Sequence, residues 1–335
     1  MNRRDLQCEA EQASYALRSS FFYRVHSLWP SLLQTLSLAG NLKVNWRGRK
    51  NLGISEAAWQ RIRSQGIDPA NVFCHPAVIR ATPTLITYYR CLALLPQKGA
   101  QRLAYATKQF EDGKSTSLSE KQAVKMAQVF NGLVSLLIES DPKWSLERSR
   151  MAALLNLGTQ VNGSWRNEIG AEGSRRVKEL LISHFVQSGL VTDASRTDGS
   201  KIRIAELAGA PEAPPIDVIR SFKTRGGYTF AFASEPDVSI RSARGALVST
   251  IEVKYGLDPA GALERYGAAG KSFGHAMKEN SRVHNIYLAS CLTPEVRRRI
   301  RRDRLVNEDF NLTEVLGDAE KRTRFLKRIE HIISP

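Results

Sequence analysis

Two short segments of the chain carry the residue types that metal-assisted phosphodiester hydrolysis needs. Pro236-Asp237 is followed, after fourteen intervening residues, by Glu252-Val253-Lys254. Mg²⁺ prefers carboxylate and water oxygens, so Asp237 and Glu252, with the carbonyl of Val253, suit a cation that neutralises charge developing on a phosphate. The ammonium of Lys254 beside them would position the attacking water and stabilise negative charge.

The elements around these residues predict a β-hairpin. Residues 228–240 and 247–254 are rich in β-branched and aromatic side chains, and the polar segment 241–245 between them ends in glycine. Because side chains alternate along a strand, Glu252 and Lys254 share a face. If Asp237 ends the neighbouring strand, all three groups converge. The alternative is a surface hairpin on which Glu252 and Lys254 form an ordinary same-face pair.

The segments on either side of the hairpin predict the rest of a compact core. Residues 165–185 have the apolar spacing of one helical face, and residues 258–273 predict a second helix that opens with Asp258-Pro259 as N-cap and first-turn pair. Residues 282–290 predict a further strand. The apolar positions of the first helix are Val177, Leu180, Leu181 and Phe185.

This order of elements resembles the PD-(D/E)xK nuclease superfamily over about residues 160–292. The resemblance implies an α/β fold (α+β mixed), in which a restriction-endonuclease-like core has a central mixed sheet flanked by helices, beside a mainly helical N-terminal region. It also implies a further acidic residue on the upstream helix. Glu168 and Glu172 are four apart and share a face, so either fits; we expect Glu172. The alternative is a solvated carboxylate near a helix start.

Within the superfamily, the chain is most similar to type II restriction endonucleases of the XcyI/XmaI group. The similar phrases are Glu252-Val253-Lys254 with the helix that follows, Thr293-Pro294-Glu295, and the N-terminal His75-Pro76 and Tyr88-Tyr89-Arg90. This resemblance implies Mg²⁺ as cofactor, double-stranded DNA as substrate, and the palindrome CCCGGG as target. It further implies a homodimer and a cognate DNA methyltransferase in the same system.

Composition agrees with a polyanionic partner. The chain has 49 Lys and Arg against 33 Asp and Glu, a net charge of +16 and a pI near 9.9. Basicity alone does not indicate cleavage. The four cysteines show neither metal-ligand spacing nor a disulfide framework, and no signal-like or membrane-length apolar run is present. We therefore expect a soluble, cytoplasmic protein.

The first 150 residues predict mainly helices, at residues 6–39 (broken near Pro30), 56–64, 84–95 and 119–139. Asp141-Pro142 marks a boundary between regions. We expect residues 1–150 to serve DNA recognition and/or dimerisation. Residues 151–335 are expected to form the catalytic domain, with a basic C-terminal helix.

Two basic clusters are candidates for DNA contact. The loop 40–53 combines Trp46 with basic residues, and Thr293-Pro294-Glu295 starts a helix on which Arg297, Arg301 and Arg304 share a face opposite Val296 and Ile300. A solvated basic loop and a solvated helix face are the alternatives. The residues expected to contact DNA are Lys43, Arg47, Arg49, Lys50, Arg265, Lys271, Arg297 and Arg301.

Other motifs do not support a different chemistry. Gly270-Lys271-Ser272 is similar to the end of a phosphate-binding loop, but Arg265 stands where the first glycine is required. The six histidines show no zinc-site spacing. Two classes of function remain: a Mg²⁺-dependent, sequence-specific endonuclease, and a basic DNA-binding or regulatory protein that does not cleave. A repair or recombination nuclease is a further alternative within the enzyme class.

Overall fold

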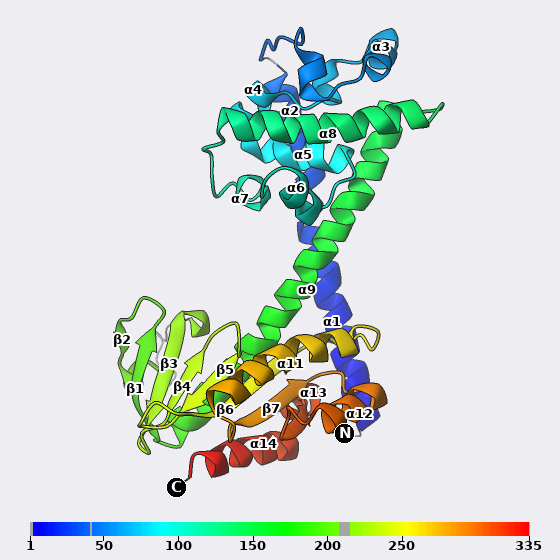
Figure 1. Cartoon of the computed structure of the whole chain (residues 1–335). Coiled ribbons are helices and arrows are strands. Elements are labelled where there is room, and N and C mark those ends of the chain that lie inside the picture. The colour runs from blue at the N-terminus through cyan, green and yellow to red at the C-terminus, as the bar shows by residue number, and fades with distance from the viewer. Residues whose placement is uncertain (1–2, 41, 208–214, 335) are drawn as a thin grey trace. The chain divides into compact units, whose positions relative to one another are not determined.

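The structure, a computed structural model, describes residues 3–40, 42–207 and 215–334 (Figure 1). It divides into two compact units: a helical unit, Arg18–Trp165, and a sheet unit, Met1–Leu17 with Arg166–Pro335. These bounds differ from the expected 1–150 and 151–335 because one helix, α9 (Leu146–Gln187), runs without interruption through the expected boundary. Helix α1 (Arg3–Arg24) likewise has residues in both units.

Side-chain caps fix the starts of two predicted helices of the helical unit. Ser55 accepts a hydrogen bond from the backbone N–H of Ala58 at the start of α3 (Glu56–Ser64). Ser119 and Gln122 form a reciprocal capping box at the start of α8 (Glu120–Ser140). These two helices confirm the predictions for 56–64 and 119–139 to within one residue.

The other elements of the helical unit are shorter than the sequence pattern indicates. The predicted helix 6–39 breaks at residues 25–27, before Pro30, which lies in the first turn of α2, where its missing N–H costs no helical hydrogen bond. The predicted helix 84–95 ends at Leu92. The elements are α2 (Leu28–Ala39), η1 (Arg49–Leu52), η2 (Pro69–Asn71), α4 (Pro76–Ala81), η3 (Pro83–Leu85), α5 (Ile86–Leu92), α6 (Gln97–Leu103) and α7 (Lys108–Glu111).

A buried ion pair lies in the core of the helical unit. The side chains of Arg90 and Glu111 are 1% and 3% exposed. Arg90 donates from Nε to Oε1 of Glu111 over 2.7 Å and from Nη2 to Oε2 over 2.9 Å, and Gln97 donates to Oε2 over 2.9 Å. A third nitrogen of Arg90 donates to the carbonyl of Leu95. Both oxygens of the buried carboxylate therefore have partners.

The sheet unit contains a mixed sheet, which confirms the predicted fold class. In the described residues it has eight strands in the order β2-β1-β3-β4-β5-β6-β7-β8. Neighbours from β2 to β6 are antiparallel, whereas β6, β7 and β8 are parallel. The strands are β1 (Val191–Arg196), β2 (Lys201–Ile202), β3 (Ile219–Thr224), β4 (Thr229–Phe232), β5 (Val238–Arg241), β6 (Leu247–Lys254), β7 (His284–Ala289) and β8 (Glu308–Asn311).

Helices cover both faces of this sheet. Side chains of β6 and β7 such as Ile251 and Leu288 share a core with α9, α13 (Leu312–Gly317) and α14 (Ala319–Ile332). Tyr287 and Ala289, which alternate with them in β7, share a second core with α11 (Ala262–Glu279) and α12 (Pro294–Asp303). The short elements α10 (Ile204–Leu207) and η4 (Ile216–Val218) complete the unit.

The apolar face of α9 is buried as predicted, whereas α11 starts later than the sequence indicates. Val177, Leu181 and Phe185 are buried and Leu180 is partly buried, which confirms the apolar face. The prediction that Asp258-Pro259 opens α11 is wrong. The helix begins at Ala262 after Gly261, because the Asp258 carboxylate accepts the N–H groups of Ala260 and Gly261 in a turn. Among the described residues, no helix is both long and apolar enough to span a membrane.

Candidate active site

The hairpin that carries the candidate catalytic residues is formed by β5 and β6. Val238 pairs with Ile251 and Ser239 with Thr250, so Asp237, one residue before β5, lies next to Glu252. Asp237 does not end a long strand: the predicted strand 228–240 is two strands, β4 and β5, joined by residues 233–237. The predicted turn is confirmed, with Gly245 in the left-handed region at φ 81°.

Three functional groups converge at this hairpin. The Nζ atom of Lys254 lies 2.7 Å from Oε2 of Glu252 and 3.6 Å from Oδ2 of Asp237. Glu252 and Lys254 are two residues apart in β6, and their register partners in β7, Tyr287 and Ala289, belong to the core shared with α11. The sequence therefore predicted correctly that these side chains share one face.

Asp237 is held on both of its carboxylate oxygens. The backbone N–H of Val253 donates to Oδ2 over 2.9 Å, and the hydroxyl of Ser174 donates to Oδ1 over 2.6 Å. The side chain of Asp237 is only 12% exposed. These contacts fix the plane of the carboxylate, because hydrogen bonds from two different elements restrain both oxygens.

Glu252 is the least satisfied of the three groups. Its side chain is 1% exposed, and Oε1 accepts no hydrogen bond of ordinary geometry from any described residue. Burial raises the pKa of Glu252, the ammonium of Lys254 lowers it and the carboxylate of Asp237 raises it; the nearby Ser272 hydroxyl has a small lowering effect, and the pKa stays above its usual value. A buried carboxylate oxygen without a partner is costly, which is typical of a site that awaits a ligand.

Lys254 remains a cation in this setting. Burial lowers the pKa of Lys254, but the carboxylates of Glu252 and Asp237 outweigh burial and raise the pKa above its usual value. One ammonium thus faces two carboxylates. The arrangement can hold the ammonium of Lys254 next to a substrate phosphate and the water molecule that attacks it.

Helix α9 brings a hydroxyl to the site in the position where we expected a carboxylate. Glu172 is bound instead to Arg175 at 2.8 Å and to Arg176 at 2.7 Å, contacts that lower the pKa of Glu172. The group of α9 that contacts Asp237 is that of Ser174. Sequence reasoning missed Ser174 because it searched this helix for a negative charge. A catalytic role for Glu172 or Glu168 stays a prediction.

A glycine allows α9 to approach the end of β6. A Cβ atom added at Gly173 would lie 2.4 Å from Cβ of Tyr255, a separation that real Cβ atoms do not show. Tyr255 directly follows Lys254, and Ser174 directly follows Gly173. Glycine at position 173 is therefore the sequence signal that could have indicated contact between this turn of the helix and the motif strand.

The residues present offer a small donor set for a cation. In the parts of the chain that the structure describes, no group of three or more His, Cys, Asp or Glu side chains is placed to hold a metal ion. Asp237 and Glu252 give two carboxylates, and Oε1 of Glu252 accepts no regular hydrogen bond from the described residues. Mg²⁺ is commonly held by one or two carboxylates, with water and substrate phosphate completing its shell, so two carboxylates fit it.

The predicted DNA-contacting loop of the helical unit divides into exposed and packed residues. Lys43, Arg47 and Lys50 are exposed. Arg49 instead pairs with Glu56 at 2.9 Å and lies 4.9 Å from the centre of the Trp59 ring. Trp46, the aromatic residue of the loop, also packs against Trp59. The expected residue Asn41 of this loop lies outside the described residues.

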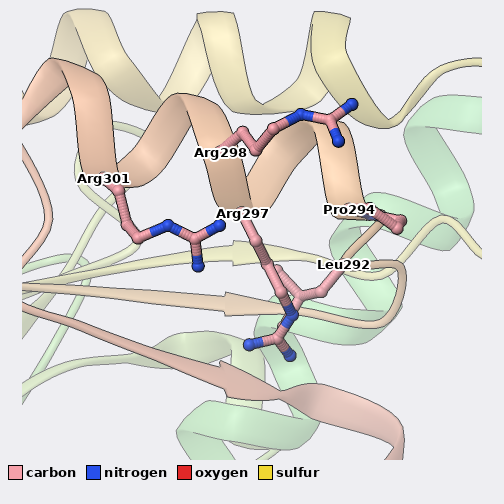
Figure 2. Close-up of a pocket in the computed structure, with 5 residues that line it drawn as sticks. All are labelled: Leu292, Pro294, Arg297, Arg298 and Arg301. Atoms are coloured by element: carbon pink, nitrogen blue, oxygen red, sulfur yellow. The ribbon is translucent and has the colours of Figure 1, made fainter.

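The basic helix of the sheet unit forms as predicted. Thr293 caps α12, and Val296 and Ile300 are buried. Figure 2 shows an open pocket at its start, where Arg297 and Arg301 extend to one side of the helix and Arg298 to the other, with Leu292 and Pro294 beside them. Arg297 forms an ion pair with Asp309 at 2.9 Å.

Three further basic residues of the sheet unit have different surroundings. Arg304 does not extend the arginine face of α12, because it is the left-handed C-cap with φ 53°. Arg265 donates to the backbone carbonyl of Asp258 and fills space left by Gly256 and Gly261. Lys271 is exposed on α11. DNA contact by Arg265 and Lys271 stays a prediction.

Comparison with known proteins covers most of the chain. The family model described as XcyI restriction endonuclease matches residues 28–288. A curated relative, "Type II restriction enzyme XcyI" of Xanthomonas campestris pv. cyanopsidis, is 27% identical over 222 residues. The aligned part is 62% of this chain and 60% of the relative, so it spans less than two-thirds of the relative's length. The family match includes Ser174, Asp237, Glu252 and Lys254, whereas α12 lies beyond it.

Proposed function

Since the chain belongs to the XcyI restriction endonuclease family, we propose that it is a type II restriction endonuclease that hydrolyses phosphodiester bonds of double-stranded DNA. The observation that carries this proposal is the convergence of Asp237, Glu252 and Lys254 within one hydrogen-bonded cluster. A family match alone would leave the chemistry unassigned. The two carboxylates and the ammonium of this cluster support metal-assisted hydrolysis of a phosphodiester.

Mg²⁺ is the cofactor that the donor set favours. Asp237 and Glu252 would hold it, with the carbonyl of Val253, and when bound it would neutralise charge that develops on the phosphate. Lys254 holds its ammonium next to both carboxylates, where it orients the attacking water and stabilises negative charge on a phosphate oxygen. Burial of Glu252 keeps bulk water away from this cluster and strengthens these interactions.

The same proposal extends to target and assembly. A palindromic site presents two equivalent strands, so a homodimer with one active site per strand is the matching arrangement. We propose CCCGGG as the palindrome, the target that the resemblance of the sequence to the XcyI/XmaI group implies. Cytoplasmic action beside a protecting DNA methyltransferase completes the proposal.

Contact with the DNA backbone would come from exposed basic residues of both units. In the sheet unit these are Arg301 and Lys271; in the helical unit they are Lys43, Arg47 and Lys50. Each guanidinium or ammonium that neutralises a phosphate releases counterions, which favours binding at low salt. Arg49, Arg265 and Arg297 have intramolecular partners already, so we propose that they support these surfaces and contribute less to DNA binding.

Cleavage of defined DNA tests the proposal. The purified chain is incubated with Mg²⁺ and a plasmid that carries one CCCGGG sequence, beside a plasmid in which that sequence is altered, and the fragment ends are sequenced. We expect one double-strand cut within CCCGGG and none in the control plasmid. Cuts at another fixed sequence would overturn the target alone, whereas a smear or structure-dependent nicking would favour a repair nuclease.

Three substitutions separate cleavage from binding. Asp237→Ala, Glu252→Ala and Lys254→Ala are each expected to abolish cutting while DNA affinity, measured by fluorescence anisotropy without Mg²⁺, stays close to wild type. The exposed Ser183→Ala serves as control. Undiminished cutting by all three variants would overturn the assignment of the site. Tight DNA binding by the wild type without any cutting would favour the non-cleaving alternative.

A further inference from the structure

The contact from α9 to the candidate site is made by a neutral hydroxyl. Ser174 Oγ donates to Oδ1 of Asp237 over 2.6 Å, while the backbone N–H of Val253 occupies the other oxygen, Oδ2. We propose that Ser174 is a positioning residue, which fixes the carboxylate plane of Asp237 for binding of the divalent cation. This inference rests on the proposed nuclease function and adds a residue to it.

The hydrogen bond from Ser174 has a clear preferred acceptor. The hydroxyl has one proton and two oxygens in reach: Oδ1 of Asp237 at 2.6 Å and the carbonyl of Gly170 at 3.3 Å. Donation to a charged carboxylate is stronger and shorter than donation to a neutral carbonyl. In an α-helix, the carbonyl of residue 170 also accepts the backbone N–H of residue 174. Loss of the hydroxyl would therefore deprive Asp237 of a donor and leave the helix intact.

A hydroxyl at this place has a different effect from a third carboxylate. It donates a hydrogen bond to the carboxylate of Asp237, whereas a carboxylate at hydrogen-bond distance would repel it. Each carboxylate oxygen accepts more than one contact, so Oδ1 keeps a lone pair for a cation after it accepts the bond from Ser174. Groups that orient metal ligands in this way commonly change metal affinity by about 10–100-fold when removed.

The backbone around Ser174 is built for this contact. Gly173 allows the helix to lie against Tyr255, because any Cβ at position 173 would be 2.4 Å from Cβ of Tyr255. Tyr255 is the residue after Lys254, so the closest approach of α9 to β6 is at the end of the motif strand. Gly173 therefore sets how closely α9 lies to β6, and this approach brings Ser174 to Asp237.

Cation binding without DNA tests the role of Ser174 directly. Binding of Mn²⁺ to full-length wild type, Ser174→Ala, Ser174→Thr and Ser183→Ala is followed by electron paramagnetic resonance. Asp237→Ala identifies the signal of the site. We expect Ser174→Ala to weaken Mn²⁺ binding by about 10–100-fold. Ser174→Thr, which keeps the hydroxyl, and Ser183→Ala, an exposed serine of the same helix, are expected to stay close to wild type.

Cleavage supplies the second readout. For Ser174→Ala we expect the Mg²⁺ concentration at half-maximal rate to rise by a similar factor, with most of the rate restored at saturating Mg²⁺. Unchanged Mn²⁺ and Mg²⁺ dependence in Ser174→Ala, or equal losses in Ser174→Ala and Ser174→Thr, would overturn the role of the hydroxyl while the nuclease function stands. A wild type that neither cuts DNA nor binds Mn²⁺ through Asp237 would overturn both.

Discussion

Two buried glutamates, one in each unit, have opposite surroundings. Glu111 in the helical unit and Glu252 in the sheet unit are 3% and 1% exposed. Both oxygens of Glu111 are bound by Arg90, and these contacts outweigh burial and lower the pKa of Glu111. Glu252 binds Lys254 through one oxygen only, its Oε1 has no regular hydrogen bond from the described residues, and its pKa is raised.

The difference distinguishes a charge whose contacts are complete from one that is a candidate for ligand binding. A buried ion pair with complete hydrogen bonds has no capacity left for a ligand. Glu252 has that capacity, because one of its oxygens accepts no regular hydrogen bond from the described residues and a second carboxylate and an ammonium lie beside it. Burial alone would make both glutamates candidates for a functional role. Their hydrogen bonds distinguish Glu111, whose contacts are complete, from Glu252, whose contacts are not.

The largest expected effect is on stability, when the ion pair between Arg90 and Glu111 is broken. Glu111→Gln leaves the buried guanidinium of Arg90 without its counter-charge, which costs about 3–5 kcal/mol of unfolding free energy. Urea titration followed by tryptophan fluorescence measures it, because every tryptophan of the chain lies in the helical unit: Trp29, Trp46, Trp59, Trp144 and Trp165. A wild-type urea midpoint for Glu111→Gln would show that this pair contributes little to stability.

The same change from Glu to Gln at position 252 should reduce activity and leave the stability of the protein unchanged. Glu252→Gln keeps the shape of the side chain and removes a charge whose burial is unfavourable. We expect cleavage to fall by roughly 10³-fold, as when one pre-organised electrostatic group leaves an active site, with no fall in the thermal midpoint. Differential scanning fluorimetry and a plasmid assay give the two numbers. A variant that loses stability and still cuts would reverse the comparison.

Sequence patterns predicted the relative placement of the candidate catalytic residues, because strand periodicity determines their geometry. Glu252 and Lys254 must share a face wherever residues 247–254 form a strand, and a polar turn ending in Gly245 brings Asp237 back to them. These inferences need only local rules. The helix 165–185 followed for the same reason, whereas the mixed sheet was implied by the family resemblance.

Features that depend on packing were not predictable in this way. The sequence did not reveal that α9 continues from Leu146, since Gly158 and Gly163 weaken a helical pattern that the rest of the structure overrides. β8 has the polar sequence Glu-Asp-Phe-Asn and becomes a strand only because β7 offers it an edge. Gly173 signals a close approach of this helix turn, but Ser174 carries no charge and no periodic signal, so only the fold shows that its hydroxyl meets Asp237.

A smaller effect is expected where α9 approaches the site. Gly173→Ala puts a methyl group 2.4 Å from Cβ of Tyr255, and overpacking of this kind typically costs about 1–3 kcal/mol. Because the helix must shift, the contact of Ser174 with Asp237 should lengthen and cleavage should fall. Both are measured by thermal unfolding and the plasmid assay.

Gly170→Ala is the matched control on the same helix. A Cβ at Gly170 meets no heavy atom within 4 Å, and alanine in a helix interior is favoured over glycine by about 0.5–1 kcal/mol. We therefore expect Gly170→Ala to be as stable as wild type or more stable, with full activity. Equal behaviour of the two variants would show that the approach of α9 to Tyr255 is not needed.

The smallest effect concerns arginines, which repeat the contrast between complete and incomplete pairing. Arg90 is fully used inside the helical unit, whereas Arg301 on α12 has no ion-pair partner among the described residues and lines an open pocket (Figure 2). Arg301→Ala should weaken binding to CCCGGG and unrelated DNA by the same factor. It should also reduce the slope of log affinity against log salt by about one.

Arg324→Ala is the control, because it removes the same charge from an exposed arginine of α14. If both variants change the slope equally, net charge suffices and α12 makes no local phosphate contact. A loss confined to CCCGGG would instead place Arg301 at a base.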